Sequence, residues 1–218
     1  MEAVLFDMDG TLLDTLADLD TSVNYALARF GLPGVAADET RQAAGYGSVV
    51  LMDELSHHAY PTDSEEFGRL LSCFAAHYNA HHDDATAPYE GVFELLEGLS
   101  RRGAKMAVVS NKIHKDTVEL NELYFARYIP VAVGRNDEMA PKPAPDMALA
   151  ACERLDVAPE RAFYVGDSEP DVQVAKNAGC VSVGCTWGFR SREVLAAEKP
   201  DYLVDDPRDL LALYDELA

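Results

Sequence analysis

The spacing of hydrophobic positions changes early in the chain. Ala3–Phe6 is a short apolar run typical of a buried strand. Over residues 15–30 the apolar side chains recur at helical spacing, and Gly31 ends that pattern. Further helical patterns cover residues 38–44, 48–58 and 63–80. Since no convincing strand pattern appears before residue 104, the sequence predicts an all-helical stretch after the first strand.

From residue 90 onward, helix and strand patterns alternate. The expected helices cover residues 90–102, 112–122, 144–155, 170–178 and 207–217. The expected strands cover residues 104–109, 129–133, 161–166, 180–185 and 201–204. Alternation of this kind is typical of a parallel sheet with helices on both faces. The predicted fold class is therefore α/β, with a Rossmann-like parallel sheet and an inserted small helical domain.

The inserted helices have recognisable boundaries. One lies near Leu13-Asp14, and the other lies in the polar stretch at residues 82–88. We expect a Rossmann-like core from residues 1–14 and 85–218 and a helical domain from residues 15–84. Two linkers on one side of a sheet also form a plausible hinge.

Composition narrows the possible functions. A chain of 218 residues that is 48% hydrophobic can form one sizeable core and a small extra module. The formal charge of −20 argues against nucleic-acid binding, which depends on Lys and Arg, but not against a small phosphorylated substrate. No apolar run approaches the ~20 residues of a membrane span, and no basic-then-apolar leader is present, so a soluble cytoplasmic protein is expected.

The cysteines also fit the expectation of a cytoplasmic protein. The four cysteines lack CxxC spacing, and a chain of this size does not need disulfides for stability. Reduced, mostly buried thiols are expected. The sequence leaves open whether the protein is a monomer or a homodimer.

Acidic side chains directly follow the first predicted strand. Asp7 and Asp9 flank Met8, and Gly10-Thr11 come next. Chemistry in open α/β sheets lies at the carboxyl ends of strands, where Gly10 permits the turn that lets the two carboxylates point differently. One carboxylate could then attack while the other moves a proton. The alternative is an ordinary turn, because Asp and Gly are common in turns.

Three later segments place polar groups at comparable positions. Ser110-Asn111 ends a predicted strand before a helix, where the pair could bind an anion or merely cap that helix. Lys142 lies between two prolines that restrict its backbone, although a surface lysine is the alternative. Asp167 ends another strand, and Asp171 could form a capping box with the intervening Ser168.

The order of these groups is more informative than any one of them. Two acids, a hydroxyl, a lysine and further acids, each at a strand end, are what phosphoryl transfer through an enzyme carboxylate requires. Carboxylate oxygens around a small cation that keeps several waters indicate Mg²⁺ rather than zinc.

At this point the chain resembles the haloacid dehalogenase-like phosphatases over its whole length. The motifs that match are Asp7-x-Asp9-Gly10-Thr11, Ser110, Lys142 and Gly166-Asp167-x-x-x-Asp171. The resemblance implies that Asp7 attacks phosphorus and that Asp9 protonates the leaving oxygen and then activates water. True dehalogenases lack the acid at the Asp9 position.

The same resemblance implies the binding roles. The residues expected at the phosphoryl group are Gly10, Thr11, Ser110, Asn111 and Lys142. The implied Mg²⁺ ligands are Asp7, the backbone carbonyl of Asp9, and Asp167, with Asp171 either a ligand or a support.

The inserted helices resemble the α-helical cap of that family. Within them, Gly45-Tyr46-Gly47 resembles the substrate loop of phosphoglycolate phosphatase-like members, and Arg41 beside it is a candidate for a substrate anion. A simple turn between helices is the alternative. The first lysine of the chain is Lys105, so the cap lacks the lysine with which phosphonoacetaldehyde hydrolases form a Schiff base.

The functional expectation is a Mg²⁺-dependent phosphatase of a small phosphorylated metabolite, with phosphoglycolate first. A β-phosphoglucomutase-like sugar phosphomutase is the alternative within the family, although Thr11 replaces the valine usual there. A non-catalytic phosphate-binding protein is the alternative outside enzymes. Trp187 and Phe189, after the strand at 180–185, either border the active-site mouth or pack in the core.

Overall fold

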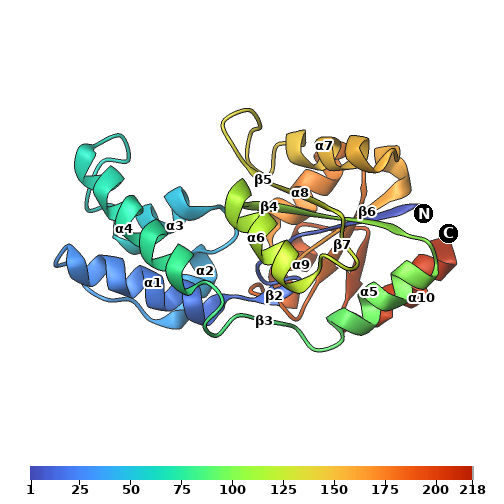
Figure 1. The fold of residues 1–218 in the computed structure, drawn as a ribbon, viewed down its shortest axis with the longest axis horizontal. Helices are drawn as coiled ribbons and strands as arrows, with labels where there is room; N and C mark the ends of the chain where they lie inside the picture. The colour runs from blue at the N-terminus through green and yellow to red at the C-terminus, as the bar shows by residue number, and fades with distance from the viewer. Residues whose placement is uncertain (218) are drawn as a thin grey trace. The chain divides into compact units, whose positions relative to one another are not determined.

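The computed structural model describes residues 1–217, and it separates the chain into two compact units (Figure 1). The first, here called the sheet unit, contains Met1–Leu13 and the chain from Pro88 onward. The second, the helical unit, is Asp14–Ala87. Each unit has its own hydrophobic core, formed by two clusters in the sheet unit and one in the helical unit.

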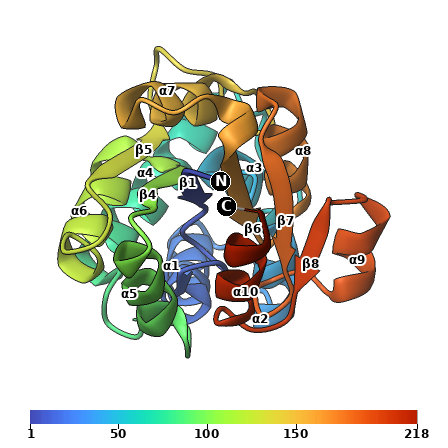
Figure 2. The same cartoon turned by 90° about the vertical axis from the view of Figure 1, so that its right-hand side faces the viewer.

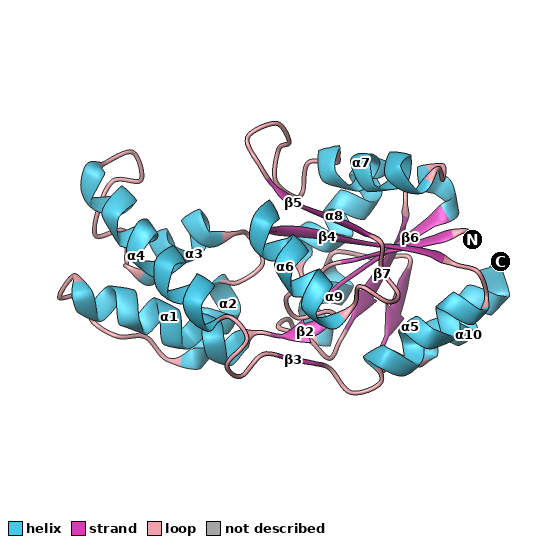
Figure 3. Cartoon of the chain, in the orientation of Figure 1, coloured by secondary structure: helices cyan, strands magenta, loops and turns pink. Residues whose placement is uncertain are grey.

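A parallel sheet of six strands forms the centre of the sheet unit (Figure 3). The strands are β1 (Ala3–Phe6), β4 (Lys105–Ile113), β5 (Val131–Arg135), β6 (Ala162–Gly166), β7 (Val181–Cys185) and β8 (Tyr202–Val204). They lie in the order β5-β4-β1-β6-β7-β8, and every neighbouring pair is parallel. The α/β Rossmann-like prediction is confirmed.

Helices cover both faces of this sheet (Figure 2). The helices of the sheet unit are α5 (Val92–Arg101), α6 (His114–Tyr124), α7 (Asp146–Leu155), α8 (Glu169–Ala178), α9 (Arg192–Ala197) and α10 (Asp209–Leu217). One face packs against α5, α6 and α10, and the other packs against α7 and α8.

The side chains of β1 alternate between two covered faces of the sheet, which explains why its sequence is apolar throughout. Val4 and Phe6 belong to the cluster under α5 and α10, whereas Ala3 and Leu5 belong to the cluster under α7 and α8. Since successive side chains point to opposite faces and both faces are covered, all four positions are buried.

The strand order places a topological switch point beside β1, where the carboxyl ends of the central strands lie side by side. Strands added to β1 on one side continue through β4 to β5, and those on the other side continue through β6 to β8. This reversal beside β1 is a topological switch point, where open α/β sheets bind ligands at the carboxyl ends of the strands. Asp7 follows β1 and Asp167 follows β6 at this point.

The helical unit contains α1 (Leu16–Arg29), α2 (Ala37–Ala43), α3 (Ser48–Leu55) and α4 (Glu65–His81). Their apolar faces form one cluster around Val23, Met52 and Leu70. Asp18 is buried on α1, where its carboxylate accepts hydrogen bonds from the backbone N–H groups of Ala85 and Thr86 at 2.8–3.1 Å. This carboxylate ties the first helix to the end of the unit.

Several local features differ from the sequence-based expectation. Strand β4 continues to Ile113 instead of ending at residue 109, because its pairing with β5 resumes after a register shift between Ser110 and Ile113. Ser110 therefore lies inside an irregular strand and not at a helix N-terminus, so the helix-capping interpretation was wrong. Helix α9 and the paired two-residue strands β2 (Leu13–Asp14) and β3 (Ala87–Pro88) were not anticipated. Among residues 1–217, none of the helices combines the length and apolar character needed to cross a bilayer.

Candidate active site

Three buried carboxylates meet at the switch point of the sheet. Asp7 follows β1, while Asp167 and Asp171 flank the start of α8 after β6. One ligand oxygen from each lies within 4.8 Å of the others, and each residue is at most 3% exposed. The topology thus brings together acids that are 160 residues apart in sequence.

A single buried lysine lies among these acids. Lys142 Nζ is 2.9 Å from Asp7 Oδ1 and 2.6 Å from Asp171 Oδ1, and its side chain is inaccessible to solvent. The alternative of a surface lysine is thereby excluded. A buried ammonium requires paired anions, and here two carboxylates supply them.

Asn111 holds the backbone of that lysine. Its Oδ1 accepts the Lys142 N–H at 2.7 Å, and its Nδ2 donates to the Lys142 carbonyl at 3.2 Å. Both ends of the amide are therefore engaged with the lysine loop, although Asn111 was expected among the phosphate-binding residues. Asn177 adds an exposed hydrogen bond from Nδ2 to the Pro143 carbonyl in the same loop.

Two glycines make room for the carboxylates. Gly10 has φ +82°, and a Cβ built on it would lie 2.3 Å from Asp167 Oδ2. A Cβ on Gly166 would lie 2.3 Å from the Cβ and Cγ of Asp171. No side chain fits at these distances, so the Asp-x-Asp-Gly and Gly-Asp motifs contain glycine for steric reasons.

Burial and mutual repulsion change the electrostatics of the cluster. Burial, followed by repulsion from Asp171, raises the pKa of Asp7 to about 7 even though Lys142 opposes the shift. Burial and the charges of Asp171 and Asp7 likewise raise the pKa of Asp167 well above its usual value. The pKa of Lys142 is raised well above its usual value by Asp171 and Asp7, which outweigh burial.

This donor set suits a hard divalent cation. Three carboxylates face one ammonium group, so the fully ionised cluster lacks positive charge. An all-oxygen carboxylate set is the kind that Mg²⁺, Mn²⁺ or Ca²⁺ prefers, whereas zinc sites favour nitrogen and sulfur. The sequence-predicted acids therefore fit a metal ion, and their chemistry does not distinguish among these ions.

Asp9 is paired with a second lysine, Lys112, and is not one of the three clustered carboxylates. Lys112 Nζ lies 3.1 Å from Asp9 Oδ2, and the Asp9 side chain is 18% exposed while that of Lys112 is 6% exposed. Asp9 Oδ1 is buried without a hydrogen-bond partner. Sequence reasoning missed Lys112, because its pairing with Asp9 depends on the register shift in β4.

The hydroxyl groups occupy different positions around the site. Thr11 Oγ donates to Asp167 Oδ1 at 3.1 Å, so Thr11 supports a carboxylate. Ser110 is 2% exposed, and its Oγ accepts the backbone N–H of Lys112 at 3.2 Å. Ser168 forms the expected capping box with Asp171, whose Oδ2 accepts the Ser168 N–H at 3.1 Å.

The remaining sequence-predicted residues belong to the helical unit. Gly45 and Gly47 have φ of +106° and +89°, so the loop between α2 and α3 uses backbone conformations that favour glycine. Tyr46 is exposed, and Arg41 Nε lies 3.7 Å from Asp38 Oδ1. Arg41, Gly45 and Gly47 are half-buried, and Ala43 and Ala44 between them are buried.

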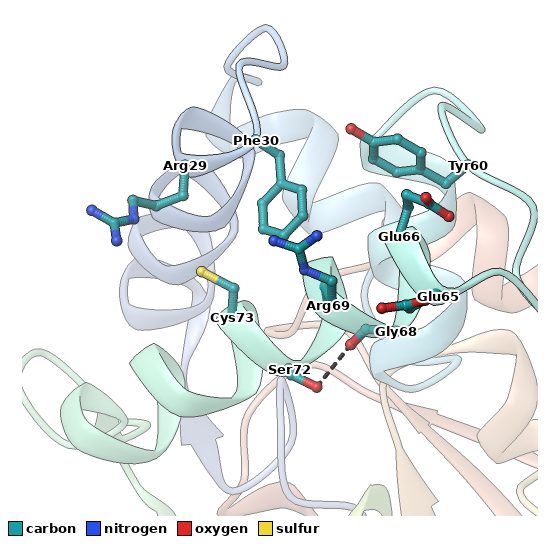
Figure 4. A pocket seen from close by; sticks show the side chains of 9 residues that line it. All are labelled: Arg29, Phe30, Tyr60, Glu65, Glu66, Gly68, Arg69, Ser72 and Cys73. Carbon is teal, nitrogen blue, oxygen red and sulfur yellow. Dashed lines mark hydrogen bonds between the residues drawn. The ribbon is translucent and has the colours of Figure 1, made fainter.

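A broad hollow of about 900 Å³ lies elsewhere in the helical unit (Figure 4). Its lining comprises Arg29, Phe30, Tyr60, Glu65, Glu66, Gly68, Arg69, Ser72 and Cys73. The rings of Phe30 and Tyr60 meet edge to face at 6.3 Å, and Ser72 Oγ donates to the Gly68 carbonyl. None of the residues predicted to bind substrate or metal lines it.

Comparison with known proteins identifies the family of this chain. A family model for "Haloacid dehalogenase-like hydrolase" matches residues 4–185. Phosphoglycolate phosphatase 1 of Pseudomonas aeruginosa is 34% identical over 219 residues, covering 99% of this chain and 80% of that protein. Phosphoglycolate phosphatase of Escherichia coli K12 is 33% identical, covering 97% of this chain and 91% of the relative.

A solved structure shows the same architecture. The crystal structure of a predicted phosphoglycolate phosphatase from Haemophilus somnus matches with a TM-score of 0.88 and 29% identity, covering 98% of this chain and 97% of that one. The family model, the relatives and the fold all indicate one family. The chain therefore belongs to the haloacid dehalogenase-like hydrolase family.

Proposed function

We propose that this enzyme hydrolyses a small phosphorylated metabolite, with 2-phosphoglycolate as the first candidate, through a phosphoryl group carried on Asp7. The enzyme class is phosphatase, a phosphoric monoester hydrolase. The observation that carries the proposal is the placement of Asp7 at the end of β1, 2.9 Å from the buried Lys142 ammonium and beside two further carboxylates. Phosphoglycolate comes from the names of the relatives.

In the first step, a carboxylate oxygen of Asp7 attacks phosphorus, and the bond between phosphorus and the leaving oxygen breaks. Asp9 gives its proton to that oxygen, so the product alcohol leaves neutral at this position. In the second step, Asp9 takes a proton from a water that attacks phosphorus. The bond between Asp7 and phosphorus then breaks, which releases phosphate and restores both carboxyl groups.

The surrounding groups offset negative charge. Lys142 contacts Asp7 and is positioned to attract a phosphoryl oxygen, while Ser110 at the irregular end of β4 offers a hydroxyl. Mg²⁺ held by Asp7, the Asp9 carbonyl and Asp167 would supply positive charge for the phosphoryl oxygens. Asp171 supports this arrangement because its two oxygens bind Lys142 and Ser168.

The helical unit is proposed as the cap that selects the leaving group. Its loop of Gly45, Tyr46 and Gly47 exposes an aromatic side chain between two glycines of positive φ, with Arg41 nearby in sequence. A glycolate leaving group carries a carboxylate, for which an arginine is a suitable partner. Arg41→Ala is expected to raise KM for 2-phosphoglycolate more than for p-nitrophenyl phosphate.

The test is phosphate release from 2-phosphoglycolate, sugar phosphates, nucleoside monophosphates and p-nitrophenyl phosphate, with Mg²⁺ and with chelator. We expect 2-phosphoglycolate to be preferred and chelation to abolish turnover. Asp7→Asn should remove activity toward every ester because an amide does not form the acyl phosphate, whereas Asp63→Asn, on an exposed segment, serves as the control. Full activity of Asp7→Asn would refute the mechanism, and conversion of glucose 1-phosphate to glucose 6-phosphate without phosphate release would indicate a mutase.

A further inference from the structure

The Asp167 carboxylate is held on one side by the segment that follows β7 and on the other by Thr11. The backbone N–H of Phe189 donates to Asp167 Oδ2 at 2.7 Å in a buried position. The hydroxyl of Thr11 donates to Asp167 Oδ1 at 3.1 Å. Because each oxygen accepts one fixed hydrogen bond, the carboxylate plane cannot rotate freely, yet each oxygen keeps a second lone pair.

Thr11 is itself held by the same segment. Trp187 Nε1 donates to the Thr11 carbonyl at 3.0 Å, and Cys185 Sγ lies 3.7 Å from Thr11 Oγ. The indole N–H is a donor only, so its direction is unambiguous. The position of the Thr11 hydroxyl, and through it of Asp167 Oδ1, therefore depends on Trp187.

Gly188, between Trp187 and Phe189, packs directly against the backbone of the Asp-x-Asp-Gly motif. A Cβ on Gly188 would lie 2.2 Å from the Gly10 carbonyl oxygen and 2.4 Å from Asp167 Cβ. Only hydrogen fits there, and the contact is with backbone and with a short buried side chain, neither of which can move aside. Gly188 thus fixes the segment against both the Asp-Gly turn and the acid.

We propose that Cys185–Phe189, here called the clamp segment, is a positioning element for the metal ligand Asp167, with Trp187 acting through Thr11. The inference rests on the proposed metal site. Partners that orient metal ligands typically change metal affinity by ~10–100-fold when they are removed. Trp187 packs against the hydrophobic core of the sheet unit, which was one of its two sequence-based alternatives, and the positioning role is additional to that packing.

The chain offers a direct spectroscopic measurement. Trp187 is the only tryptophan, so intrinsic fluorescence reports this one position. Titrating the metal-free enzyme with Mg²⁺ or Mn²⁺ is expected to change the fluorescence emission of the wild type. The reason is that the indole N–H donates a hydrogen bond to Thr11, in the turn that also contains the proposed metal ligands after β1. Asp167→Asn should abolish that change at the same cation concentrations.

The affinity for Mn²⁺ tests whether the clamp segment positions Asp167. Trp187→Phe keeps an aromatic ring but removes the N–H, and calorimetry with Mn²⁺ should show binding at least about 10-fold weaker than wild type. Thr11→Val should weaken binding similarly, whereas Thr11→Ser keeps the hydroxyl and should restore it. A purely structural role would lower the unfolding midpoint in chelator and leave Mn²⁺ affinity unchanged.

Wild-type Mn²⁺ affinity in both Trp187→Phe and Thr11→Val would overturn the inference while leaving the proposed function intact. If the wild type hydrolyses phosphoesters in chelator and binds neither cation, the metal assignment and this inference both fail. A loss of all phosphatase activity in the wild type together with normal Mn²⁺ binding would instead contradict the proposed function alone.

Discussion

Lys112 Nζ lies 3.1 Å from Asp9 Oδ2, and the two side chains are 6% and 18% exposed. The residue proposed to move the proton is therefore paired with a cation two positions beyond Ser110. A substantially buried ion pair of this kind fixes the direction of a carboxylate that a flexible turn would otherwise leave mobile.

We expect Lys112→Met to lower both activity and stability. Removing one partner of a buried pair leaves an uncompensated charge, which costs ~3–5 kcal/mol when burial is complete and less at a carboxylate that is partly exposed. Urea denaturation of Lys112→Met, Asp9→Asn and the double variant forms a cycle that isolates the coupling. Additive losses in the double variant would show that the pair contributes nothing.

Gly10→Ala is expected to abolish activity. A methyl group there would overlap Asp167 Oδ2 at 2.3 Å, and φ +82° is itself unfavourable for alanine. Gly103→Ala is the matched control, since Gly103 has φ +75° and nothing within 4 Å of the added Cβ. The control should lose about 1–2 kcal/mol of unfolding free energy and keep kcat, so equal kcat in the two variants would contradict the steric argument.

The raised pKa of Asp7 predicts a pH dependence of the metal-free protein. Burial raises this pKa from 3.8 to about 7. The folded protein therefore binds the Asp7 proton more tightly than the unfolded chain does. The stability gained from this protonation is complete below pH 3.8 and is lost as the pH rises through 7. Asp7→Asn, which has no charge to bury, should therefore be more stable than the wild type at pH 8 by up to about 4 kcal/mol and should not differ near pH 4. Denaturation in chelator across this range measures the difference.

Adding Mg²⁺ should reverse that order. A cation on the carboxylates compensates the buried charge and stabilises the wild type at pH 8, whereas Asp7→Asn has lost a ligand. If chelator and Mg²⁺ give identical unfolding curves for the wild type at pH 8, the carboxylate cluster does not bind the ion under those conditions.

The sequence was sufficient for the parts of the site that local rules determine. Apolar Ala3–Phe6 followed by Asp7 indicated a buried strand with an acid at its end, and the capping box of Ser168 and Asp171 followed from spacing alone. These predictions held because they depend on neighbours in sequence.

Contacts across the sheet could not be predicted in this way. The pairing of Lys112 with Asp9 depends on a register shift in β4, and the bond from Phe189 to Asp167 depends on how the chain leaves β7. Asn111 has the residue type of an anion ligand, but only the position of the Lys142 loop shows where its amide is used. Tertiary geometry decides such roles, because one side chain can satisfy several of them.

That use of Asn111 leads to a stability prediction. Asn111→Ala leaves the buried N–H and carbonyl of Lys142 without their partners, and each loss costs ~1–3 kcal/mol. Asn177→Ala removes one exposed hydrogen bond to the same loop, where water can replace the amide, and should cost under about 1 kcal/mol. The two variants are compared by urea denaturation, and kcat should fall only for Asn111→Ala because Lys142 then loses its fixed position. Equal losses of unfolding free energy would mean that the lysine loop is held mainly by other contacts, and an unchanged kcat would separate Asn111 from the placement of Lys142.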